Sequence, residues 1–318
     1  MDMSDNENII IANINVTKDN LKMRIINSYE NFKKEEYNQM NWASINEIEN
    51  EKDIKATEIY INNENIPFNY YHEFPSQGIY TIKYIFKSKL KSTNFLFTNC
   101  TSLQKIDLSR FNTQNIINTE YMFYGCTLLQ EINFSNFTTN NVNNMQYMFY
   151  NCISLKALDL SSFVTENVTN VQYMFFYCQS LKELNLDNFN TQNVVNMKCM
   201  FYYCSSLKML NLFKFNTKNV QTMQFMFCFC KSLIKLDLSS FDTKNVDNME
   251  YMFRGCYSLI ELDLSSFDTK NVTNMGYMFC GCNSLISLDL TNFNTQNIIY
   301  KNRIFNDCNS LIFKNMII

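Results

Sequence analysis

The sequence predicts an α/β repeat fold in which equal coils of chain stack on one another, preceded by a small β-rich region. Cysteines recur every 26 residues from Cys100 to Cys308 without an insertion. A leucine follows three residues after each of these cysteines, and a phenylalanine precedes each by three. A unit this short cannot bury its own apolar side chains, so each coil must cover its neighbour.

Each coil divides into three parts when its cysteine is counted as position zero. Apolar residues at positions six and eight alternate with polar ones at five, seven and nine, which predicts a strand with one buried face. A polar loop follows. The last third has apolar residues at i, i+3, i+4 and i+7, as in Met249, Met252, Phe253 and Cys256, which predicts a short helix. Strand, bend and helix are the plan of a leucine-rich-repeat-type solenoid, with a parallel sheet on the concave side and short helices on the convex side.

The two ends of the chain depart from the repeat. We expect a small β-rich N-terminal or capping domain in residues 1–78 and a solenoid of about nine repeats in residues 79–318. At the far end, Lys301, Arg303 and Lys314 replace apolar or aromatic residues of the repeat and predict a polar cap. The elements expected in the N-terminal part are strands at 8–16, 21–27 and 78–87, a hairpin at 57–71, a helix at 28–40, and a charged loop or short helix at 46–55.

The repeat unit C-x-S-L-x-x-L-D-L-S-S-F-D-T-x-N-V-x-N-M-x-Y-M-F resembles the 26-residue repeat of bacterial surface proteins, a branch of the BspA-like leucine-rich repeats. The resemblance covers about residues 90–318 and implies a solenoid used for adhesion or protein binding, often on a cell surface. Bacterial members usually carry an export signal and an anchor, and neither is found here. On sequence signals we therefore expect a cytoplasmic protein, whereas the resemblance implies the cell surface.

The regular cysteines are interpreted as structural. Position zero ends the apolar face of the predicted helix, so the thiols are expected in the core as small apolar groups. Disulfides and a metal site are the alternatives, but the single His72 and the missing export signal favour neither. Asparagine at position fifteen is expected to bond the backbone at each bend, and its members are Asn115, Asn141, Asn167, Asn193, Asn219, Asn245, Asn271 and Asn297.

Position seven carries a row of acidic side chains. Asp237, Asp263 and Asp289 form its longest uninterrupted run, with like charges about 5 Å apart on stacked strands. One interpretation is that Ser239, Ser265 and water satisfy these carboxylates. The alternative is a cation site, because closely spaced carboxylates repel one another unless a cation intervenes.

One coil places apolar residues on the face that is otherwise polar. Met209 and Phe213 stand at positions five and nine, on either side of Asn211, and Glu183 and Asp187 lie on the coil before. Exposed apolar residues on a binding surface are candidate contact points. Together with the acidic row, these residues are the predicted partner-binding site.

Composition narrows the function. A net charge of −3 and a pI near 5.4 argue against nucleic acid as the partner, and no apolar run reaches the ~18 residues of a membrane span. His72 and scattered carboxylates form no nucleophile motif, phosphate loop or metal set, so we expect neither an enzyme nor a cofactor. The prediction is a monomeric, non-catalytic protein–protein interaction scaffold. The alternative is a cell-surface adhesin-like binding protein of the BspA type.

Overall fold

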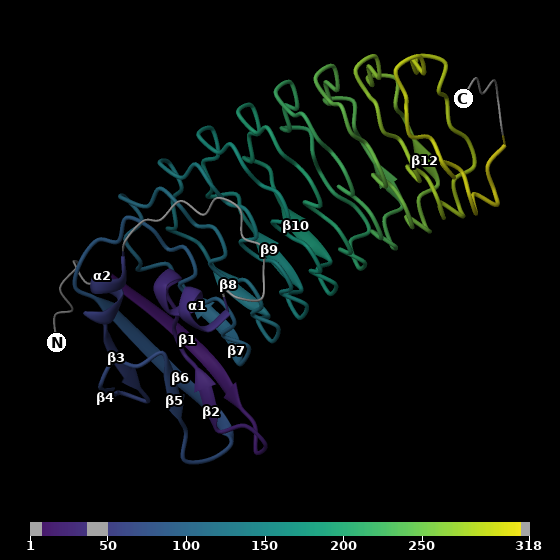
Figure 1. Ribbon diagram of the computed structural model, residues 1–318. Coiled ribbons are helices and arrows are strands. Elements are labelled where there is room, and N and C mark those ends of the chain that lie inside the picture. The colour runs from purple at the N-terminus through teal and green to yellow at the C-terminus, as the bar shows by residue number, and fades with distance from the viewer. Residues whose placement is uncertain (1–7, 37–49, 313–318) are drawn as a thin grey trace.

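The computed structural model describes residues 8–36 and 50–312, which form an N-terminal sheet and a long stack of coils (Figure 1). Strands and turns predominate, and the few helices lie in the N-terminal part. The expected strands and hairpin are present there, and the hairpin turns at Asn62 and Asn63, whose φ angles are 47° and 73°. The elements of this part are β1 (Asn8–Val16), β2 (Lys22–Arg24), α1 (Tyr29–Glu36), α2 (Glu51–Lys55), β3 (Glu58–Ile61), β4 (Glu64–Ile66), β5 (Tyr71–Glu73) and β6 (Gly78–Phe86).

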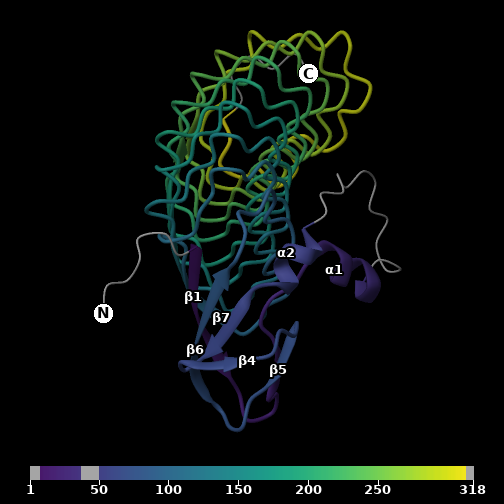
Figure 2. The same cartoon turned by 90° about the vertical axis from the view of Figure 1, so that its left-hand side faces the viewer.

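The N-terminal sheet continues into the first coils. Its strand order is β4-β3-β6-β1-β7-β8, where β7 is Leu103–Asp107 and β8 is Glu131–Asn133. Strand β1 pairs antiparallel with both β6 and β7, which lie near it in Figure 2. Strand β7 pairs parallel with β8. Strand β1 thereby covers the edge that the first coil would otherwise leave unpaired. The division at residue 78 stays a prediction, and one sheet extends across it.

Successive coils are joined by parallel pairing. Strand β9 (Ala157–Asp159) pairs with β10 (Glu183–Asn185), and β11 (Lys235–Leu236) pairs with β12 (Glu261–Leu262). These strands are shorter than the five positions predicted for each coil. A second parallel ladder runs through position eighteen, at Ser92, Asn118, Asn144, Asn170, Asn196, Thr222, Asn248, Asn274 and Tyr300.

The predicted short helices are wrong. The described coils contain none, and the segment around Met249–Cys256 is a series of turns. The Met252 amide bonds the Met249 carbonyl three residues back, but the Phe253 amide donates to Met278 in the next coil. Tyr251 and Gly255 have φ angles of 58° and 70°, in the left-handed region, so the chain cannot continue as a helix. The apolar pattern did identify the buried side chains, since Met249, Met252, Phe253 and Cys256 are fully buried.

Columns of equivalent side chains build the core. Leu155, Leu181 and Leu207 are at most 1% exposed, as the leucine spacing predicts. Phenylalanines at position twenty-three, from Phe97 to Phe305, stack with ring centroids 5.5–5.8 Å apart. Each coil therefore presents the same apolar surface to the next, which is how short units share one core.

The ladder cysteines are thiols that are buried, apart from the half-buried Cys308, and those from Cys126 onward act as hydrogen-bond donors. From Cys126 to Cys308, each Sγ donates to the carbonyl of a position-twenty-three phenylalanine, with S···O distances of 3.0–3.2 Å. Burial raises the pKa of these thiols, to about 12 at Cys178 and Cys230. The thiols therefore stay protonated and link one coil to another, which agrees with the structural interpretation.

The asparagines at position fifteen bond the backbone, as predicted, but from the surface. From Asn141 to Asn297, each Nδ2 donates to the position-fourteen carbonyl of the previous coil at 2.7–2.8 Å. At the last coil, Lys301 and Arg303 are exposed, and Lys314 lies outside the described residues. Ile299 and Tyr300 beside them are 70% and 58% exposed, so the end of the stack is part polar and part apolar.

Candidate functional site

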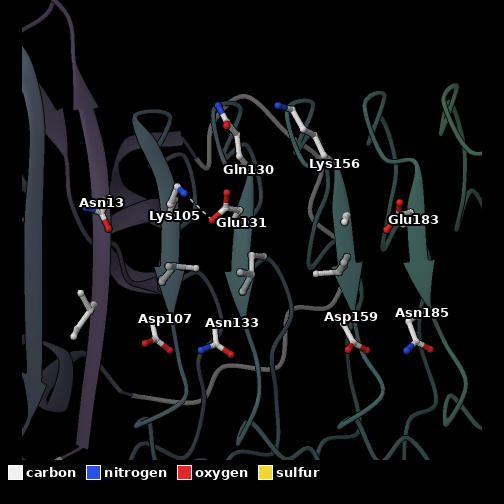
Figure 3. Close-up of a pocket in the computed structure, with 15 residues that line it drawn as sticks. Asn13, Lys105, Asp107, Gln130, Glu131, Asn133, Lys156, Asp159, Glu183 and Asn185 are labelled. Carbon is white, nitrogen blue, oxygen red and sulfur yellow. Dashed lines mark ion pairs between the residues drawn. The ribbon is translucent and has the colours of Figure 1, made fainter.

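The side chains at positions five, seven and nine form one surface of the stack, here called the strand face. Near the N-terminal end it contains a groove of about 960 Å³ lined by β1 and β7 to β10. In Figure 3, Lys105, Glu131 and Glu183 lie in one row and Asp107 is among the residues of a second row, while Gln130 and Lys156 lie on the other side of the first row. Lys105 and Glu131 form an exposed ion pair of 2.8 Å. The repeat pattern does not predict this groove, because the pairing of β1 with the first coil leaves no trace in the repeat.

Backbone amides satisfy the acidic row. The Oδ1 atoms of Asp237 and Asp263 accept the amides of Ser239 and Ser265 at 3.0 and 2.9 Å, and Asp289 accepts that of residue 291 at 2.9 Å. The backbone amides of the two serines, followed by their hydroxyls, lower the pKa of Asp237 and Asp263. These carboxylates are therefore ionised at neutral pH. Ser239 and Ser265 satisfy Asp237 and Asp263, as one interpretation of the sequence expected, and they do so with their backbone amides. Within residues 8–36 and 50–312, no cluster of potential ligands could hold a metal ion.

The coil with Met209 and Phe213 interrupts the strand face. Met209 is 76% and Phe213 is 58% exposed, and residues 209–211 form no strand. The β9–β10 pair therefore ends before this coil, and strand pairing resumes at β11 in the next coil but one. An earlier gap in the strand pairing lies between β8 and β9. Asn211 bridges the interruption, because its Nδ2 donates to Asp187 Oδ1 at 3.0 Å.

The structure brings part of the predicted site together. A groove of about 610 Å³ lies at the interruption and is lined by Glu183, Met209 and Asn211, with Lys182 and Lys208 among the other residues. Asp187 joins them through Asn211. Asp237, Asp263 and Asp289 lie on the same face, but in the coils that follow the interruption. The predicted residues therefore form two groups, one at the groove and one along the later coils.

The single histidine packs against a neighbouring aromatic ring. His72 lies on β5, and its ring packs edge-on against Phe74 with centroids 4.6 Å apart. Partial burial lowers its pKa. The contact with Phe74 is typical of a packed aromatic residue.

The repeat region matches the protein family described as "Mycoplasma protein of unknown function, DUF285", at residues 91–211 and 204–316. The chain belongs to this family. The two matched segments together span most of the coil stack, and the BspA resemblance stays a prediction. No curated protein matches the chain.

Two solved structures are similar to this DUF285 chain at low identity. A leucine-rich repeat protein of T. pallidum is 19% identical over 53% of this chain and 70% of its own, with a TM-score of 0.27. A TLR13–ssRNA13 complex is 16% identical over 70% of this chain and 41% of its own, with a TM-score of 0.23. Because these TM-scores are low, the fold rests on the pairing and packing described above. Among the described residues, no helix combines the length and apolarity needed to cross a bilayer.

Proposed function

We propose that this protein is a non-catalytic interaction scaffold, in which a leucine-rich-repeat-type solenoid presents the strand face as a concave surface to a protein partner. The observation that carries the proposal is the exposure of Met209, which lines the groove, and of Phe213, four residues further along the same coil. The equivalent side chains of the neighbouring coils are polar, and the core needs neither residue. Exposed apolar residues next to a groove are typical of protein-binding sites.

The surroundings suit a protein partner. Lys182, Glu183, Asp187 and Lys208 place both signs of charge around the apolar pair, as in the polar rim of an interface. Burying the Met209 and Phe213 side chains against a partner would contribute roughly 1.5–3 kcal/mol each. The same surface could serve the adhesin role that the BspA resemblance implies. Labelling intact and permeabilised cells separates the two roles, since only an adhesin is labelled from outside.

The test compares two double variants of the full chain. Met209→Ala with Phe213→Ala removes the apolar pair, whereas Lys235→Ala with Ser239→Ala changes the same positions one coil later. The wild type first captures partner proteins from cell extract, and cross-linking identifies those that contact the strand face. The amount of each such protein that either variant captures is then measured. We expect about tenfold or greater loss only for the first variant, with an unchanged melting temperature. Equal capture by both variants would contradict the proposal.

A further inference from the structure

The side chain at position four, next to the start of each strand, changes from lysine to isoleucine about halfway along the stack. Lys156, Lys182 and Lys208 occupy it in three successive coils, and all three are exposed. None of them takes part in the ion pairs found among the described residues. Three lysines without an ion-pair partner among the described residues therefore occupy backbone positions one coil, or about 5 Å, apart.

Isoleucine occupies the same position in the next four coils. Ile234, Ile260, Ile286 and Ile312 are 43%, 39%, 47% and 62% exposed. Most other apolar residues of these coils are buried, so the core does not require this column. A contiguous apolar strip on a surface marks an interaction site more often than scattered apolar residues do.

Backbone bonds hold the column in register. The amide of Lys182 donates to the carbonyl of Lys156 at 2.8 Å, and that of Ile234 donates to Lys208 at 3.1 Å. The same bond links each later isoleucine to the one before it, at 2.9–3.1 Å. Side chains at equivalent positions of paired parallel strands lie on the same face. Among the described residues, Lys208 follows Lys182 by one coil without such a bond, because the strand ladder is interrupted there. The lysines and isoleucines thus occupy one position in seven successive coils, here called the position-four strip.

An acidic row runs beside the apolar half of this strip. Asp237, Asp263 and Asp289 lie three residues further along the chain, which corresponds to about 10 Å, and the exposed Lys235, Glu261 and Ser287 at position five lie between the two rows. Their carboxylates are exposed, and the amides that they accept hold them in place. The surface thus has three parts: a cationic end, an apolar length and an acidic margin along that length.

We infer that the position-four strip binds one amphipathic helix of a partner protein, lying across the strands. This inference rests on the scaffold function and names the partner's chemistry. The apolar face of the helix packs on Ile234, Ile260 and Ile286, its basic edge faces the acidic row, and its acidic end faces the three lysines.

The spacing of the strip fits a helix. One helical turn rises 5.4 Å, close to the ~4.8 Å between coils, so a helix places about one apolar residue on each isoleucine. From Lys156 to Ile312 the strip spans about 29 Å, the length of roughly 20 helical residues. This is the helix-in-groove mode of recognition, with charge setting the direction.

A membrane surface fits less well. Anionic lipid would attract the lysines, but the ionised Asp237, Asp263 and Asp289 would face the same headgroups and be repelled. The three isoleucines in the middle of the strip are also less than half exposed, so they do not project far enough to insert.

The test uses two synthetic 20-residue helical peptides as probes. The matched probe has an apolar face, lysines along one edge and three glutamates at one end. The reversed probe has the same apolar face with glutamates and lysines exchanged. Fluorescence anisotropy measures the affinity of the full chain for each probe. We expect the matched probe to bind about tenfold or more tightly than the reversed probe, with a difference that shrinks at high salt.

Two variants, with one matched control, then test the apolar and the cationic parts of the strip separately. The double change Ile260→Lys and Ile286→Lys should lower the affinity for the matched probe at least about tenfold. The control, Gln104→Lys with Gln130→Lys at the same position in the first coils, should leave that affinity unchanged. The triple change of Lys156, Lys182 and Lys208 to Glu should reduce or invert the preference between the probes. Equal binding of the two probes, or indifference to these variants, would overturn the inference.

One further arm tests the lipid alternative. The full chain is sedimented with phosphatidylserine vesicles, with and without the Ile260→Lys and Ile286→Lys changes. If the chain binds the vesicles only when these isoleucines are present, and does not bind the matched probe, the inference is also overturned. The scaffold proposal is judged separately, because its variants change Met209 and Phe213 and leave the position-four strip intact.

Discussion

The coils before and after Met209 share one core but present different surfaces. Inside, the phenylalanine column passes from Phe175 through Phe201 to Phe227 with centroid distances of 5.5 and 5.6 Å. Outside, the strand ladder is interrupted and position four changes from lysine to isoleucine. The comparison teaches that the repeat fixes the buried positions of each coil, whereas its exposed positions are free to differ and so to carry function.

The largest effect expected from this comparison concerns two phenylalanines in neighbouring parts of the chain. Phe201→Ala empties a fully buried place in the column and should reduce the free energy of unfolding by about 3–5 kcal/mol. Phe213→Ala removes an exposed ring and should change it by less than about 0.5 kcal/mol. Urea unfolding followed by circular dichroism measures both. Similar losses for the two variants would mean that core and surface are not separate.

The second effect is a dependence of stability on pH. Burial raises the pKa of the Cys178 thiol to about 12, well above that of an unfolded thiol. The folded chain then keeps a proton that the unfolded chain loses, so stability is full below about pH 8.5 and falls as pH rises toward 12. Each such thiol should contribute a slope of about 1.4 kcal/mol per pH unit in this window.

Cys178→Ala should therefore reduce the slope of unfolding free energy against pH by that amount, as measured between pH 9 and 11. Ser205→Ala removes no ionisable group and serves as the control. A slope that is the same in the wild type and in Cys178→Ala would show that the thiol is not held protonated in the core.

The smallest effect concerns the asparagines at position fifteen. Asn193→Ala removes the bond of 2.7 Å from its Nδ2 to the Glu166 carbonyl and should cost about 0.5–1.5 kcal/mol. Gln192→Ala, at the adjacent exposed position, should cost less. Thermal unfolding of the two variants checks this order. If Gln192→Ala costs as much as Asn193→Ala, the asparagine ladder is incidental.

The sequence was sufficient to predict which residues of each coil are buried, but not how the backbone places them. The spacing of Leu155, Leu181 and Leu207 predicts their burial, because an equal coil length leaves one register. The helical pattern failed because Tyr251 and its equivalents adopt left-handed φ angles, which bulky residues rarely do. Bonds to the next coil, such as Tyr251 to Gly276, hold this conformation, and they appear only once coils stack.

The candidate site was predictable where a coil departs from the repeat and not where two distant segments meet. Met209 and Phe213 break the polar pattern, so the sequence identifies them. Strand β1 joins the first coil through long-range pairing that no periodicity encodes, so the groove beside Asn13 and Lys105 was missed. The position-four strip is visible in the sequence, but only the pairing of the coils shows that its members lie in line.

Hydrogen exchange of the backbone amides tests the separation of core and surface most directly. The account predicts that the amides of Phe175, Phe201 and Phe227, which all donate to the next coil, are protected to a similar degree across the interruption. It also predicts that amides of residues 209–211 exchange faster than those of β10. Even protection along the whole strand face, or loss of protection at Phe201, would contradict the account.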